Sequence, residues 1–155
     1  MKGNEKIIGK LNSLLADELT AINQYVVHAE MCANWGYERL HKVDEKRAID
    51  EMKHAEKLIA RILFLDGMPI VSTLNKIGIG PEVESQHKCD WAAEDAAVKS
   101  YNDGIKLAAD LGDNGTRDLL TTILADEERH IDWLEAQLEQ IKQVGIQNYL
   151  IEQVD

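Results

Sequence analysis

Four long segments of helical periodicity, separated by clusters of glycine and proline, constrain the fold of this chain more than any other feature. Apolar residues recur every three or four positions over about 5–33, 37–65, 83–111 and 116–144, with strong helix formers between them. A short fifth helix is expected at 146–153, after a glycine. No segment alternates with the period of a β-strand. The sequence therefore predicts an all-α fold.

The connections between these segments predict the topology. The first and third are short, whereas the stretch from Leu65 to Pro81 holds both prolines and forms one long connection. Two helical hairpins joined by a long crossover make a four-helix bundle. Because 155 residues suit one ordinary domain, we expect residues 1–155 to form a single domain.

Composition argues against several function classes. The chain carries 17 basic and 28 acidic residues, a net charge of −11, and no cluster of lysine or arginine. This balance disfavours binding to nucleic acid or to an anionic membrane surface, and it attracts cations. The apolar runs are too short for a membrane span, and the N-terminus lacks a signal-peptide pattern. Cys32 and Cys89 lie too far apart for a metal knuckle, so we expect free thiols and a cytoplasmic protein.

Each of the four apolar stripes contains a glutamate where a core residue is expected, and two of these glutamates begin the pattern Glu-x-x-His. The residues are Glu18, Glu51, His54, Glu94, Glu127 and His130. A buried carboxylate without a partner is costly or takes up a proton. Four such carboxylates in one core therefore need a cationic partner.

One spacing relates these residues. Glu18 and Glu94 are 76 residues apart, and the same separation holds for the two Glu-x-x-His pairs and for Tyr25 and Tyr101. The two hairpins therefore look like copies of one unit packed about a pseudo-twofold axis. Residues at i and i+3 share a helix face, so each Glu-x-x-His pair can reach a single point. This pattern is that of the dinuclear carboxylate site in ferritin-like bundles.

Charge supports two metal ions at this site. Two divalent cations balance four carboxylates, and two neutral imidazoles complete the ligand set. We expect Glu51 and Glu127, near the axis, to bridge the metals, and Glu18 and Glu94 to bind one metal each. Such ligands suit Fe, Mn or Zn alike. A single Glu-x-x-His is weak evidence on its own, since exposed helices often carry one, and the repeat is what favours a metal site.

Two further acids, Asp50 and Asp126, obey the same spacing and directly precede the bridging glutamates. Each could accept the second ring N–H of the histidine on the other hairpin. We expect Asp50 to pair with His130 and Asp126 with His54; the alternative is two solvated aspartates. The two tyrosines of the repeat are expected to be core residues hydrogen-bonded to site carboxylates rather than radical carriers.

Four stretches carry a family resemblance: residues 18–25 (ELTAINQY), 49–55 (IDEMKHA), 126–135 (DEERHIDWLE) and 145–150 (GIQNYL). Through them the whole chain resembles the bacterioferritins, the haem-containing branch of the ferritins. The resemblance implies a hollow shell of 24 subunits, built from twofold dimers, that oxidises Fe(II) and stores a ferric mineral. It also implies that the six residues above are ferroxidase ligands for two iron ions per subunit.

The resemblance gives Met52 a role that spacing does not. Met52 lies about 100° around the helix from Glu51, on an outward face, where a methionine is usually a packing or surface residue. It matches the methionine that binds a b-type haem from both sides of a twofold dimer interface. The resemblance further implies a small ferredoxin or reductase that supplies electrons for iron release. Some bacterioferritins carry a histidine at the position of Lys46, which binds cavity-wall iron with Asp50, and a protonated lysine cannot replace it.

Two other classes share parts of this pattern. A rubrerythrin-type di-iron peroxidase would oxidise without storage, but a fused rubredoxin needs paired Cys-x-x-Cys motifs, which this chain lacks. A DNA-protecting mini-ferritin splits its ligands between subunits, whereas this chain supplies the full set. The remaining histidines, His28, His41 and His87, match no motif and are expected to be surface or packing residues.

Overall fold

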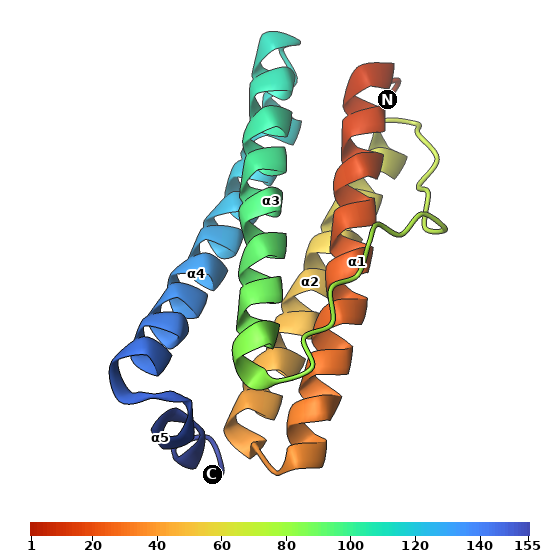
Figure 1. Ribbon diagram of the computed structural model, residues 1–155. Helices are drawn as coiled ribbons and strands as arrows, with labels where there is room; N and C mark the ends of the chain where they lie inside the picture. Colours follow the sequence, from red (N-terminus) through yellow and green to blue (C-terminus); the bar gives the residue numbers. More distant parts are fainter.

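The computed structural model describes residues 1–155 as five helices and no strand. The helices are α1 (Glu5–Trp35), α2 (Glu38–Phe64), α3 (Val83–Asp110), α4 (Asn114–Val144) and α5 (Ile146–Ile151). The hairpins α1–α2 and α3–α4 pack side by side, and residues 65–82, here called the crossover, run along the outside of the bundle (Figure 1). The predicted four-helix bundle with a long connection and a short fifth helix is confirmed.

The helix ends follow from local capping chemistry. The side chain of Asn4 accepts a hydrogen bond from the Lys6 amide at 2.9 Å and starts α1. Gly36, at φ 83°, ends the same helix in the left-handed region that favours glycine. Asp113 Oδ1 accepts from the Thr116 amide at 2.9 Å, so α4 starts at Asn114, two residues before the predicted position.

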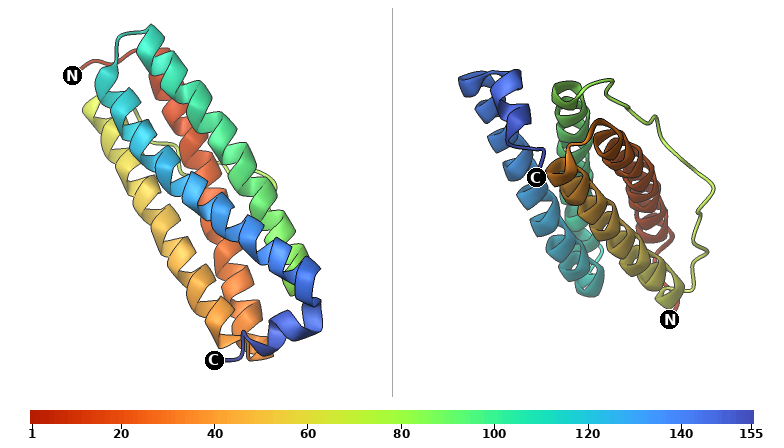
Figure 2. Two further views of the ribbon diagram at one scale, coloured as in Figure 1. Left: turned by 90° about the vertical axis from the view of Figure 1, so that its left-hand side faces the viewer. Right: turned by 90° about the horizontal axis from the view of Figure 1, so that it is seen from below.

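The short helix α5 folds across one end of the bundle, close to the turn between α1 and α2 (Figure 2). The Arg39 amide donates to the Gln153 carbonyl at 3.0 Å, which ties the residues after α5 to the start of α2. Tyr149 of α5 is buried. None of the five helices is both long and apolar enough to cross a bilayer.

The apolar core lies mainly in the half of the bundle that holds the start of α1. Its most deeply buried members include Leu11, Leu14, Leu58, Ile62, Leu120 and Ile123. Val26 lies four residues after Ile22 in α1, a spacing that predicts a core position, yet it is 47% exposed. The middle of the bundle is occupied by the charged residues described next.

Candidate metal centre

The six predicted ligands meet in the middle of the bundle, and each of the four long helices supplies at least one. All six residues are at most 7% exposed. Their ligand atoms form two groups, with the atoms of each group within 4.8 Å of one another. The groups are Glu18, Glu51, His54 and Glu127, and Glu51, Glu94, Glu127 and His130. Glu51 and Glu127 belong to both, which is the arrangement expected of bridging carboxylates.

Both histidines direct the same ring nitrogen toward the carboxylates. His54 Nδ1 lies 2.9 Å from Glu127 Oε1 and 3.3 Å from Glu51 Oε2. His130 Nδ1 lies 3.0 Å from Glu51 Oε1 and 3.3 Å from Glu94 Oε1. Nδ1 is therefore the nitrogen that each ring can offer to a metal, and Nε2 is left for a different partner.

Three carboxylate oxygens of the centre are buried without a hydrogen-bond donor: Glu51 Oε1, Glu94 Oε2 and Glu127 Oε1. The short distances from His Nδ1 to Glu51 Oε1 and Glu127 Oε1 lack the alignment of a hydrogen bond. An unsatisfied buried carboxylate oxygen is costly, and a cation placed between the glutamates would remove that cost. The donor set, carboxylate oxygen and imidazole nitrogen, suits Fe, Mn or Zn.

Protonation balances the charges of the metal-free centre. Burial raises the pKa of Glu51 to about 8, and the neighbouring charge of Glu18 acts in the same direction. Burial and the charge of Glu94 hold the pKa of Glu127 well above its usual range. Burial lowers the pKa of His54, but its close contacts with the carboxylates of Glu127, Glu18 and Glu51 outweigh this effect and raise it. Metal ions entering the centre therefore compete with bound protons.

Two tyrosines hold the glutamates of α1 and α3. Tyr25 on α1 donates to Glu94 Oε1 at 2.5 Å, and Tyr101 on α3 donates to Glu18 Oε1. Burial, with the adjacent carboxylates, raises the pKa of both tyrosines well above its usual value, so each keeps the proton that it donates. Each tyrosine thereby orients the glutamate of the opposite hairpin.

The two aspartates of the repeat behave differently. His54 Nε2 lies 3.0 Å from Asp126 Oδ2, which is hydrogen-bond distance. His130 Nε2 lies 3.9 Å from Asp50 Oδ2, too far for a hydrogen bond. Asp50 Oδ2 instead accepts from Lys46 Nζ at 3.1 Å. The structure thus brings together the predicted pair of Asp126 and His54. In the other predicted pair, Asp50 binds Lys46 instead of His130.

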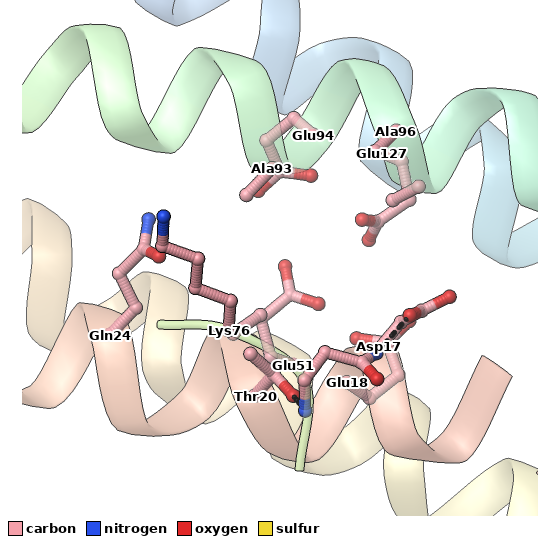
Figure 3. Close-up of a pocket in the computed structure, with 13 residues that line it drawn as sticks. Asp17, Glu18, Thr20, Gln24, Glu51, Lys76, Ala93, Glu94, Ala96 and Glu127 are labelled. Atoms are coloured by element: carbon pink, nitrogen blue, oxygen red, sulfur yellow. Dashed lines mark hydrogen bonds between the residues drawn. The ribbon is translucent and has the colours of Figure 1, made fainter. Parts of the chain in front are cut away.

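A cavity of about 150 Å³ lies beside the four glutamates, between α1 and α3 (Figure 3). The crossover contributes Asn75 and Lys76 to its lining. Asn75 is fixed there, because its amide donates to Thr20 Oγ1 at 2.9 Å and its side chain donates to Asp17 Oδ1 at 2.6 Å. The crossover therefore borders the space through which the glutamates can be reached.

Comparison with known protein families agrees with this geometry. The model of the ferritin-like domain matches residues 8–144, which include both hairpins and all six predicted ligands. The chain belongs to the ferritin family.

Curated relatives narrow the assignment within this family. The bacterioferritin of Brucella melitensis is 41% identical over 149 residues, covering 96% of this chain and 92% of the relative. That of Rhodobacter capsulatus is 38% identical over 151 residues, covering 97% and 94%. That of Mycolicibacterium paratuberculosis is 40% identical over 149 residues, covering 96% and 94%. The predicted resemblance of this ferritin-family chain to the bacterioferritins is thereby confirmed.

A second polar cluster of this ferritin-family chain was not found from the sequence. His28 and His87, expected at the surface or in packing, are both buried, whereas His41 is partly exposed. His28 Nδ1 lies 3.0 Å from a carboxylate oxygen of Asp90, and its Nε2 accepts from the Gly80 amide at 3.1 Å. Neither buried histidine follows the 76-residue spacing, which was the signal that exposed the metal centre.

Proposed function

We propose that the chain is a ferroxidase subunit of an iron-storing shell. The observation that carries the proposal is the pair of buried four-residue ligand groups sharing Glu51 and Glu127. The unsatisfied carboxylate oxygens there call for cations, and the relatives named bacterioferritin favour iron as the cation.

The substrate is a pair of Fe(II) ions bound in the centre. The four glutamates balance the charge of both ions, and hard anionic oxygens favour Fe(III) over Fe(II), which assists oxidation. Each Fe(II) loses one electron, and the pair reduces one O₂ to H₂O₂, or one H₂O₂ to two water molecules, with protons taken from solvent. Asp126 orients His54 through Nε2, while Tyr25 and Tyr101 fix the outer glutamates.

The outward face of α1 and α2 supports the assembly part of the proposal. A groove of about 230 Å³ there is lined mainly by apolar side chains, and Met52 lies in it with 45% of its surface exposed. The lining includes Ile22, Val26, Ala29, Ala48 and Ile49. An apolar groove with a thioether fits a haem, and Met52 of two dimer-related copies would hold it there. Such a group carries electrons, and a small ferredoxin or reductase would deliver them for iron release.

The ferroxidase test loads metal-free protein with Fe(II) under anaerobic conditions and then mixes it with O₂ while ferric absorbance is followed. We expect a fast phase that saturates at two Fe(II) per chain and is lost in Glu51→Ala. The matched control is Glu56→Ala, an exposed glutamate on the same helix. Loss of the fast phase in the control as well, or its survival in Glu51→Ala, would contradict the proposal.

Storage is separated from the alternatives by assembly. Both ligand groups come from one chain, which favours this proposal over a mini-ferritin with ligands split between subunits. A shell of 24 copies of 17.5 kDa has a mass of about 420 kDa and retains ferric mineral, whereas a rubrerythrin-type peroxidase does not. Light scattering before and after iron loading distinguishes them. The free thiols of Cys32 and Cys89 fit the reducing cytoplasm in which we place this activity.

A further inference from the structure

A second cavity adjoins the metal centre between α2 and α4, on the side away from Lys76. Its volume is about 440 Å³. The charged and titratable residues of its lining are Lys46, Arg47, Asp50, Asp126, Arg129 and His130. Three permanent cations thus face two carboxylates in a chain whose net charge is −11. This cavity has a local excess of positive charge.

Two of the three cations are already paired. Lys46 Nζ lies 3.1 Å from Asp50 Oδ2, and Arg129 forms an ion pair with Asp126. Both cationic side chains are exposed at the rim of the cavity. These pairs account for both carboxylates of the lining, so neither is available to the third cation.

Arg47 is the cation without a partner. It is only 8% exposed, yet it forms no ion pair, and the polar side chain that it contacts is the hydroxyl of Tyr25. Arg47 nevertheless lines the cavity. Its guanidinium carbon lies 5.7 Å from the centre of the Tyr25 ring and 5.5 Å from that of Trp133. The two aromatic rings hold the guanidinium in place, and its five N–H donors exceed what the single hydroxyl of Tyr25 can accept.

We propose that this cavity binds an inorganic oxyanion of the phosphate class, with Arg47 as its principal ligand. A guanidinium presents parallel N–H donors that match two oxygens of a tetrahedral oxyanion. Lys46 and Arg129 add positive charge at the rim. Since one water occupies about 30 Å³ in the liquid, a cavity of about 440 Å³ has room for such an anion and its hydration.

The charges that oppose binding belong to the metal centre. Glu94, whose pKa lies below its usual value because of the hydrogen bond from His130 despite burial, is ionised, acts on the guanidinium of Arg47 and repels an anion in the cavity. Removing this negative charge should therefore strengthen anion binding. The purpose of the site, though not its existence, rests on the proposed function: His130 lies in both the cavity and the metal centre, so an oxyanion here would be next to newly formed Fe(III).

The test is equilibrium dialysis of radiolabelled inorganic phosphate against assembled, metal-free protein. We expect one phosphate per chain and an affinity at least about tenfold lower in Arg47→Gln. Arg117→Gln removes the same charge from an exposed, ion-paired arginine of α4 outside the cavity and should bind as the unchanged protein does. Equal affinity in Arg47→Gln, or an equal loss in Arg117→Gln, would overturn the proposal.

Two further measurements separate a specific site from a general effect of charge or folding. Sulfate should displace the label at concentrations far below those of chloride, and displacement by equal concentrations of both would refute an oxyanion site. Arg47→Lys keeps the charge without the planar fork and should bind with an intermediate affinity, while thermal melting establishes that each variant is folded. Because no metal is present, failure of phosphate binding and failure of the ferroxidase are distinguishable.

Discussion

Metal binding should release protons, and the number follows from the raised pKa values of the centre. With a pKa of about 8, Glu51 is about nine-tenths protonated at pH 7. His54 also carries a proton, because its close contacts with the neighbouring glutamates raise its pKa despite burial. Metals bind carboxylate and neutral imidazole, so both protons must leave. We therefore expect at least about two protons to be released per chain when two Zn(II) ions bind at pH 7.

The sign of the pH dependence is fixed by the same argument. As pH falls from 7 to 6, protons compete more strongly, and the combined affinity for the two ions should fall about 100-fold, or about 2.7 kcal/mol. As pH rises past about 8, Glu51 loses its proton without metal and the dependence becomes shallower. Zn(II) is suitable because it occupies such ligands without redox chemistry.

Isothermal titration calorimetry in two buffers of different ionisation enthalpy measures the released protons directly. Glu51→Gln should lower the release by about one proton, whereas Glu56→Gln on the exposed face of α2 should leave it unchanged. Heats that do not depend on the buffer would mean that the centre is already deprotonated at pH 7. That result would refute the reasoning that burial and like charges hold protons on these residues.

Two further predictions concern stability. Gly80→Ala should lower the melting temperature by several degrees, because a Cβ there would lie 2.2 Å from the Gln86 backbone nitrogen. Gly9→Ala should instead stabilise the fold by about 0.5–1 kcal/mol, because a Cβ at position 9 of α1 would have no other atom within 4 Å. Burial lowers the pKa of His87 to about 4, so the unfolded chain binds more protons between pH 6.5 and 4 and stability falls as the pH falls through that window, by about 2 kcal/mol. Melting curves of His87→Gln from pH 7 to 4.5 should lack this loss, and slopes parallel to those of the unchanged protein would contradict it.

Much of the fold could be predicted because periodicity and chain breakers act locally. Every helix boundary lies within two residues of its predicted position, and the differences trace to caps such as Asp113, whose side chain bonds the Thr116 amide. The six candidate ligands could be predicted because a glutamate on an apolar stripe conflicts with burial, and because the conflict recurs at one spacing. If two copies of one hairpin pack about a pseudo-twofold axis, their equivalent buried side chains must meet near that axis, and the six side chains do meet there.

The same repeat led to a wrong prediction for the pair of Asp50 and His130, because the residues one turn before the two equivalent aspartates differ. Asp50 and Asp126 are equivalent by spacing, but the position equivalent to Lys46 is Thr122. Lys46 lies one helical turn before Asp50 and binds its carboxylate, so His130 has no aspartate within hydrogen-bond distance. Equivalence of two residues in a repeat therefore does not guarantee equivalent contacts when the residues one turn away are unrelated.

Residues 76 positions apart differ in type at the two ends of the bundle, and the connectivity of the chain explains this difference. A pseudo-twofold axis through the metal centre exchanges the ends, so His28 corresponds to Gly104 and Asp90 to Leu14. At one end the crossover enters α3, and its Gly80 amide needs the acceptor that His28 provides with support from Asp90. At the other end Gly104 lets Leu120 pack closely, since a Cβ there would lie 3.0 Å from a Leu120 methyl carbon, and the equivalent of Asp90 is the core residue Leu14. Only one crossover exists, so the repeat persists where both halves supply side chains to the same candidate centre and is lost where the crossover contacts one half alone.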